Sequence, residues 1–194
     1  PAPASLSWEA LAYAEPVAAA LSVLTVPEAL TAERVAVLGE GRIADLTARV
    51  LDAWVPGRPV QRLTVASVPP EPLDVVIETV PTEKALHQAA TWLRPGGLLV
   101  IKSRPALAVP WPHQAMVLRR LRAVGVAYGS FDEGLAAMAS GRLATSSLFG
   151  PRFPWTFEGV CAALDRECQG GTSGKLFFAI GVPTADVPTA DMDA

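Results

Sequence analysis

A short apolar run that ends in two glycines gives the first strong pattern along the chain. Val35 to Leu38 are all apolar, Gly39 and Gly41 follow, and apolar residues then recur at helical spacing from residue 42 to residue 54. A buried run followed by a helical period predicts a strand over 35–38, a tight turn, and a helix over 42–54. The turn reads G-x-G-x-x-A and ends at Ala44, the spacing that lets a backbone approach a pyrophosphate.

The same two patterns, buried apolar runs and helical spacing, divide the rest of the chain into strands and helices. Apolar runs predict strands over 60–66, 74–78, 98–101, 117–128 and 175–180. Helices are predicted in two pieces within 1–30, from Thr82 to about Leu93, over 130–140 and over 156–168, with a proline-rich loop over 104–113. The arginines within 117–128 also suit a helix, so that alternative stays open.

Strands that alternate with helices predict an α/β fold, a Rossmann-like doubly wound parallel sheet with helices on both faces. We expect a helical lead-in over 1–30, the Rossmann-like domain over 31–181, and a flexible polar tail over 182–194 that repeats Pro-Thr-Ala-Asp.

The sheet is expected to be shortened by one β-α unit. Too few residues separate the predicted strand ending near Ser67 from Asp74 for a helix and a further strand. Between Asp52 and Glu71 there is no acidic residue, although a dinucleotide fold places one there to bind the adenosine ribose. Glu40 also puts a negative charge in the turn, which Arg42 is placed to offset.

Composition narrows the possible functions. The chain has 194 residues, of which 51% are hydrophobic and 18% charged, with a net charge of −3, so we expect a globular protein with one well-buried core. This charge balance argues against a nucleic-acid partner. The apolar runs are too short for membrane insertion, and no basic segment leads into an apolar one as in a secretory signal, so a cytoplasmic location is expected.

The two cysteines are expected to be reduced core residues. Cys161 and Cys168 lie seven positions apart on one predicted helix, about 10 Å apart at a rise of about 1.5 Å per residue, too far for a disulfide. With Phe157 and Leu164 they form one apolar face.

The order of these features resembles the medium-chain, zinc-type alcohol dehydrogenases over nearly the whole chain. The segments that carry the resemblance are Leu11–Ala18, Val37–Ala44, Asp74–Glu78, Leu93–Val100, Ala139–Leu143 and Arg152–Pro154. The resemblance implies a site for NAD or NADP, in which the pyrophosphate lies on Gly39, Gly41, Arg42, Ile43 and Ala44 while Thr79 and Val80 face the nicotinamide. The alternative is that the glycines are retained turn geometry and that Thr79 and Val80 are ordinary turn residues. Lys102 and Ser103, after a later strand, have the same two interpretations.

Two departures from the family pattern limit what the resemblance implies. The N-terminal catalytic domain of the family is not represented, and His87, His113, Cys161 and Cys168 have no metal-ligand spacing, so no zinc is expected. Glu15 stands where some relatives have a glutamate near the zinc, but one carboxylate does not make a metal site, and a residue at a helix end is the favoured interpretation. We therefore expect a chain that is not independently catalytic.

Three hypotheses of different kinds follow. The first is a partial or degenerate NAD(P)-binding domain of an oxidoreductase, completed by a partner protein chain or a homo-oligomer. The second is a pseudoenzyme retained as a structural or assembly subunit. The third is a methyltransferase dependent on S-adenosylmethionine, which shares the glycine turn.

Overall fold

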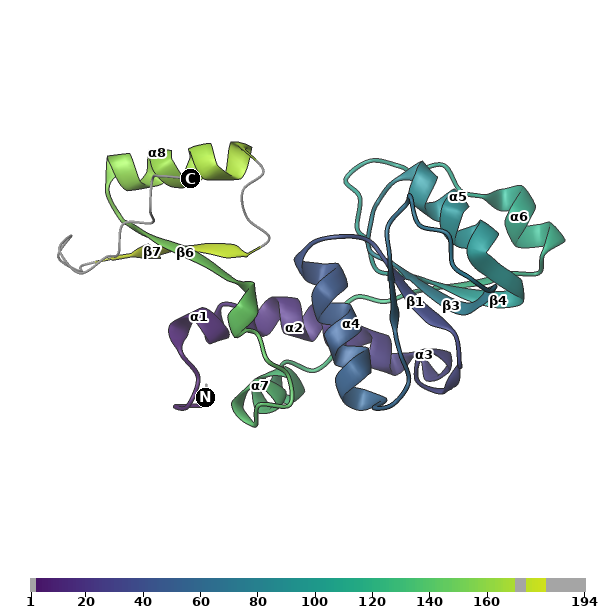
Figure 1. Cartoon of the computed structure of the whole chain (residues 1–194), viewed down its shortest axis with the longest axis horizontal. Coiled ribbons are helices and arrows are strands. Elements are labelled where there is room, and N and C mark those ends of the chain that lie inside the picture. The colour runs from purple at the N-terminus through teal and green to yellow at the C-terminus, as the bar shows by residue number, and fades with distance from the viewer. Residues whose placement is uncertain (1–2, 170–173, 181–194) are drawn as a thin grey trace.

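The computed structural model describes residues 3–169 and 174–180, and the elements below lie within these ranges (Figure 1). The α-helices are α1 (Trp8–Leu11), α2 (Ala14–Leu21), α3 (Pro27–Thr31), α4 (Arg42–Trp54), α5 (Glu83–Trp92), α6 (His113–Leu118), α7 (Phe131–Ala139) and α8 (Phe157–Cys168). The strands are β1 (Val35–Leu38), β2 (Gln61–Leu63), β3 (Leu73–Glu78), β4 (Leu93–Ile101), β5 (Arg122–Gly125), β6 (Phe149–Pro154) and β7 (Lys175–Ala179). Two 3₁₀ helices, η1 (Ser22–Thr25) and η2 (Ser146–Leu148), connect them.

Five strands form one parallel sheet in the order β2-β1-β3-β4-β5. This confirms the predicted Rossmann-like α/β fold. It also confirms the shortening, because β2 connects to β3 through residues 64–72 without a helix and lies at the edge of the sheet.

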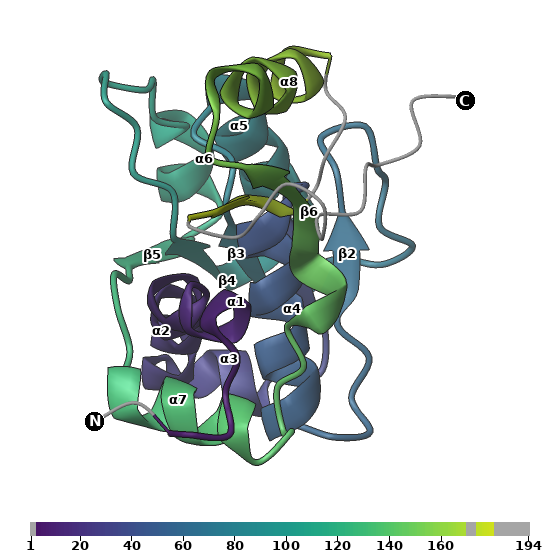
Figure 2. The ribbon, with the colours of Figure 1, turned by 90° about the vertical axis from the view of Figure 1, so that its left-hand side faces the viewer.

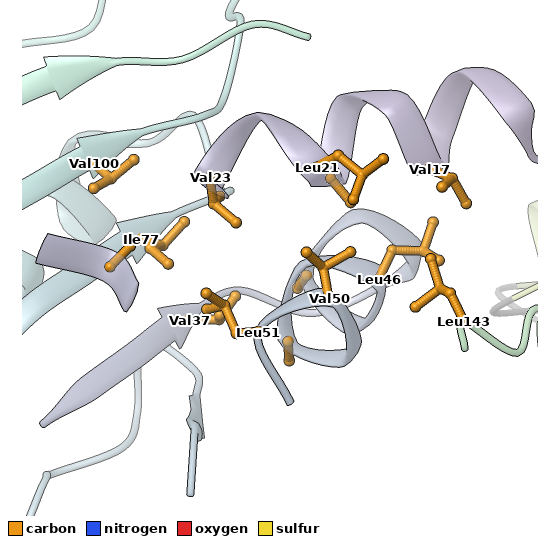
Figure 3. Packing of buried hydrophobic residues seen from close by; sticks show 14 of the residues in the cluster. Val17, Leu21, Val23, Val37, Leu46, Val50, Leu51, Ile77, Val100 and Leu143 are labelled. Carbon is orange, nitrogen blue, oxygen red and sulfur yellow. The ribbon is translucent and has the colours of Figure 1, made fainter. Parts of the chain in front are cut away.

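Each face of the sheet carries its own apolar cluster, as the alternation of side chains along a strand requires. On one face Val37, Ile77 and Val100 pack against α2 and α4, where Leu21, Leu46 and Val50 are buried (Figure 3). On the other face Leu38, Val76 and Leu99 pack against α5. The strands are therefore buried on both sides, which explains why their sequences are nearly continuous apolar runs.

Polar side chains fix where several helices begin. The hydroxyls of Ser7, Thr82, Ser130 and Thr156 accept hydrogen bonds from N–H groups in the first turns of α1, α5, α7 and α8. The predicted starts at Thr82 and Ser130 are confirmed.

A smaller unit made of β6, β7 and α8 lies apart from the main sheet (Figure 1). The two strands pair in parallel, and Tyr13 near α2 joins them to the rest of the chain. The Tyr13 hydroxyl donates to the carbonyl of Leu148 and accepts from the N–H of Lys175 at 3.1 Å, while its ring lies 5.6 Å from that of Phe149.

Several sequence predictions need correction. β6 is not among the predicted strands, because it contains Gly150, Pro151 and Pro154, and glycine and proline are depleted in strands. β2 is shorter than 60–66, β4 begins already at Leu93, and 117–128 contains the end of α6 and only a short strand. The predicted tail over 182–194 lies outside the described residues.

The prediction that α8 buries its cysteine face is wrong. Phe157 is 80% exposed and Leu164 is 60% exposed, Cys168 is exposed, and Cys161 is partly exposed. The helix instead buries Gly159 and Ala163. A Cβ on Gly159 would lie 2.2 Å from the carbonyl oxygen of Pro154, so the helix approaches β6 through its small residues. Both cysteines are free thiols, as predicted.

Candidate nucleotide site

The candidate site lies at the carboxyl edge of the main sheet, where the strand ends are in register. Leu38 of β1 pairs with Leu63 of β2 and with Glu78 of β3, and Glu78 pairs with Ile101 of β4. After β1 the chain continues to β2 on one side, while β3 lies on the other side. In open parallel sheets such a reversal opens a crevice in which ligands bind.

The glycine turn lies on this crevice. Gly39 has φ +142° and Gly41 has φ +87°, both in the region that favours glycine. A Cβ on Gly39 would lie 2.1 Å from Thr79 Oγ1, so at this position two chain segments meet closely. Around Gly41, by contrast, an added Cβ would meet no atom within 4 Å. The side of the turn at Gly41 is therefore open to a ligand.

The predicted pyrophosphate residues continue from this turn into α4. Gly41 is the N-cap of α4, and Arg42, Ile43 and Ala44 form its first turn. N–H groups in the first turn of a helix lack intrahelical acceptors and carry a partial positive charge. The geometry therefore brings these backbone donors together at the crevice, where they suit an anion.

Thr79 and Val80 pack beside the turn from the end of β3. The Thr79 hydroxyl donates to the carbonyl of Leu38 at 2.9 Å. Val80 packs against the apolar cluster between the sheet and α5. A Cβ on Gly39 would also lie 2.9 Å from Val80 Cγ2. Both residues thus hold the turn in place, and Thr79 also lines a neighbouring cavity.

A small cavity of about 100 Å³ lies at the turn itself. Besides Gly39, Gly41 and Ala44 its lining includes the charged side chains Glu40, Asp45 and Arg62. Arg62 comes from β2 and also pairs with Asp52 at 3.0 Å. Sequence reasoning missed Arg62 because only the pairing of β2 with β1 brings it to the turn.

The adenosine side of the crevice differs from the usual dinucleotide pattern. β2 ends at Leu63, and a tight turn follows in which the Ser67 hydroxyl accepts from the N–H of Thr64 at 2.9 Å. No carboxylate stands at this strand end to accept from a ribose. The residues present thus fit the pyrophosphate better than they fit the adenosine.

Two buried ionisable groups lie near the edge on opposite faces of the sheet. Burial raises the pKa of Glu78, whose Oε2 accepts from the Ser103 hydroxyl at 2.8 Å. Burial lowers the pKa of Lys102 to about 8. The Lys102 ammonium donates to the carbonyl of Ala19 and, at 3.0 Å, to the Ser22 hydroxyl, so it holds the end of α2 against β4.

The described part of the chain holds no group of three or more His, Cys, Asp or Glu side chains arranged to bind a metal ion. His87 is on α5, 3.8 Å from Glu83, and His113 begins α6. No helix in the described ranges has the length and apolarity needed to cross a bilayer.

Comparison with solved structures gives the same fold. The chain is similar to 2R,3R-butanediol dehydrogenase from Bacillus subtilis, with a TM-score of 0.71 and 19% identity over 93% of this chain and 60% of that one. It is similar to S. aureus TarJ in complex with NADPH, with a TM-score of 0.76 and 15% identity over 93% of this chain and 67% of that one. It is also similar to alcohol dehydrogenase TADH from Thermus sp. ATN1, with a TM-score of 0.75 and 19% identity over 92% of this chain and 60% of that one.

No protein-family model matches the chain, and no curated protein matches it. The chain spans about 60% of the length of several of these solved dehydrogenases. The resemblance to alcohol dehydrogenases inferred from sequence motifs is thus confirmed at the level of the fold: this chain has the fold that these dehydrogenase structures share over the matched region.

Proposed function

We propose that this chain is an NAD(P)-binding domain of an oxidoreductase related to the zinc-type alcohol dehydrogenases. The observation that carries the proposal is the open turn at Gly41, which begins α4 at the switch point of the sheet. Similar folds are found in structures that hold NADPH, NADH and NAD. A bound nicotinamide cofactor would supply the hydride acceptor or donor.

The residues of this chain would bind and orient that cofactor. The N–H groups of Arg42, Ile43 and Ala44 would hold the pyrophosphate. Thr79 would lie on the nicotinamide side. Because β2 ends without a carboxylate, we expect weaker binding of the adenosine than in a dinucleotide fold that has one.

We further propose that the chain does not catalyse hydride transfer alone and that a partner protein chain supplies the substrate-side groups. Supporting this, Trp155, Phe157 and Leu164 are each at least 60% exposed on and beside α8. Apolar side chains gathered in this way favour association with another protein surface. A second copy of this chain is the other expected partner, and light scattering of the purified protein separates the two.

The cofactor proposal is tested by thermal unfolding with NADH, NADPH and S-adenosylmethionine in turn. A ligand at a hundred times its Kd stabilises the native state by about 2.7 kcal/mol. We expect stabilisation by NADH or NADPH. Stabilisation by S-adenosylmethionine alone would favour a methyltransferase, and stabilisation by none of the three would favour a structural subunit.

A matched pair of glycine variants shows whether the cofactor lies on the turn. Gly41 and Gly57 have φ +87° and φ +85°, and an added Cβ meets no atom within 4 Å at either position. Gly41→Ala and Gly57→Ala therefore introduce similar backbone strain. Only Gly41→Ala is expected to remove stabilisation by NADH or NADPH, and equal responses of both variants would contradict binding at the turn.

A further inference from the structure

A second cavity of about 280 Å³ lies beside the glycine turn at the carboxyl edge of the sheet. It is bounded by α2, by the first turn of α4, and by the segments that follow β3 and β4. The residues that line it are Glu15, Ala19, Ile43, Thr79, Pro81, Lys102, Ser103 and Arg104. Since Ile43 belongs to the first turn of α4, this cavity borders the proposed pyrophosphate position.

Positive charge gathers around this cavity. Lys102 and Arg104 are in its lining, and the charge of Arg104 acts together with burial to lower the pKa of Lys102. Burial and the charge of Arg42 lower the pKa of Lys175, which places two further cations nearby. Glu15 acts on both lysines in the opposite direction. Two lysines thus interact with the carboxylate of Glu15, and each has an arginine close to it, in a chain whose net charge is −3.

Within this cluster the carboxylate of Glu15 already has a hydrogen-bond donor. The Tyr128 hydroxyl, which follows β5, donates to Glu15 Oε1 at 2.7 Å. Glu78 is fully buried on the other face of the sheet, where burial raises its pKa and its Oε2 accepts a hydrogen bond from the Ser103 hydroxyl. In the lining of the cavity Lys102 and Arg104 outnumber the single carboxylate of Glu15, and this balance favours an anion.

Arg104 is positioned to meet a ligand. One of its N–H groups donates to the Tyr128 hydroxyl at 3.1 Å, and its guanidinium carbon lies 4.7 Å from the centre of the Tyr128 ring. A guanidinium has five N–H donors in a planar fork, so this contact orients the group and leaves donors for an oxyanion. Lys102, only 6% exposed, contributes positive charge from the buried side of the cavity.

We propose that this cavity binds a small substrate that carries an oxyanion, a phosphate or a carboxylate, and that Arg104 holds the oxyanion. The inference rests on the proposed function, because it places this substrate beside the cofactor and names its chemical class. Arg104 acts as a binding residue. Tyr128 acts through Arg104 as a positioning residue.

Ligand-observed NMR with three probes tests the inference, both in the presence of saturating NADH or NADPH and without cofactor. The probes are glycerol 3-phosphate, glycerate and glycerol, which share a polyol part and differ in the anionic group. We expect one or both anions to bind and glycerol not to bind. The variant Arg104→Gln removes the charge while keeping a donor for Tyr128, and should weaken anion binding about tenfold or more, the size of one charge-assisted hydrogen bond.

Arg166→Gln is the matched control, because Arg166 is an exposed arginine on α8. It should leave anion binding unchanged. Equal anion binding by the wild type and by Arg104→Gln, or no anion binding at all, would overturn the inference.

The two proposals can fail separately. If NADH or NADPH stabilises the protein but no anion depends on Arg104, only the substrate inference is wrong. If Arg104-dependent anion binding is found with no cofactor present and neither cofactor stabilises the protein, only the proposed cofactor is wrong. Comparison of glycerol 3-phosphate with glycerate then distinguishes phosphate from carboxylate substrates.

Discussion

At the scale of single residues, the two glycines of the turn have different tasks. Gly39 allows β1 and the end of β3 to approach each other, because any Cβ there would collide with Thr79. Gly41 leaves space at the mouth of the crevice. The G-x-G pattern therefore combines a packing requirement at Gly39 with an open ligand surface at Gly41. Substituting each glycine in turn distinguishes these two roles.

We expect Gly39→Ala to destabilise the protein more than Gly41→Ala. A non-glycine residue at positive φ costs on the order of 1–2 kcal/mol at either position, and Gly39→Ala adds a collision with Thr79 Oγ1 at 2.1 Å. Urea unfolding of both variants measures the difference. Equal free energies of unfolding for the two variants would show that Thr79 and the end of β3 move aside without a loss of stability.

Glu78 gives a pH-dependent prediction at the same scale. Burial raises its folded-state pKa above the ordinary 4.5, so the folded state favours the protonated carboxyl. Its contribution to stability is therefore complete below pH 4.5 and is lost as the pH rises through the raised pKa. Glu78→Gln has no charge to bury.

Thermal unfolding of Glu78→Gln and wild type at a series of pH values tests this. The melting temperature of the variant, relative to the wild type, should rise between pH 4 and pH 7, as expected when a group with a raised pKa is removed. A difference that stays constant over this range would mean that the Glu78 pKa is ordinary.

At the scale of elements, α8 shows how a helix can be predicted correctly and yet be assigned the wrong buried face. Its apolar stripe suggested burial, but Gly159 and Ala163 make the contact with β6. Small residues permit the close approach, and the larger apolar side chains remain on the outside. The exposed face is consequently available to another chain.

Cysteine labelling tests this orientation directly. Cys168 is exposed and Cys161 partly exposed, so a thiol reagent should modify Cys168 rapidly in the native protein and Cys161 more slowly. Single-cysteine variants, Cys161→Ser and Cys168→Ser, assign the two rates. Labelling of Cys168 only after denaturation would show that a surface covers this face in solution.

At the scale of the whole molecule, the described residues form a well-buried parallel sheet with an attached smaller unit (Figure 1). Figure 2 views the molecule from the side of this smaller unit, so that β6 and α8 lie in front of the main sheet. A two-stranded sheet is only marginally stable by itself, so β6 and β7 depend on their connection to the rest. Tyr13 makes that connection through its hydroxyl and its ring.

Amide hydrogen exchange should reveal this difference. We expect slow exchange in β1, β3 and β4, and faster exchange in β7 and α8, since local opening requires less free energy where fewer buried contacts hold the backbone. Tyr13→Phe removes two hydrogen bonds while keeping most of the ring contact, and should accelerate exchange in β7 selectively. Uniform acceleration throughout the chain would show that the two parts unfold as one unit.

The sequence alone was sufficient to predict β1, α4, β3, α5 and the parallel sheet, because local periodicity and caps set these elements. The shortened sheet was also predictable, since chain length limits what fits between β2 and β3. Pairing over long sequence distances decided the remainder. The register of β1 with β2 brings Arg62 to the turn, and the end of β5 places Tyr128 between Glu15 and Arg104. Such contacts join residues whose local sequence carries no sign of each other, so only the tertiary structure shows them.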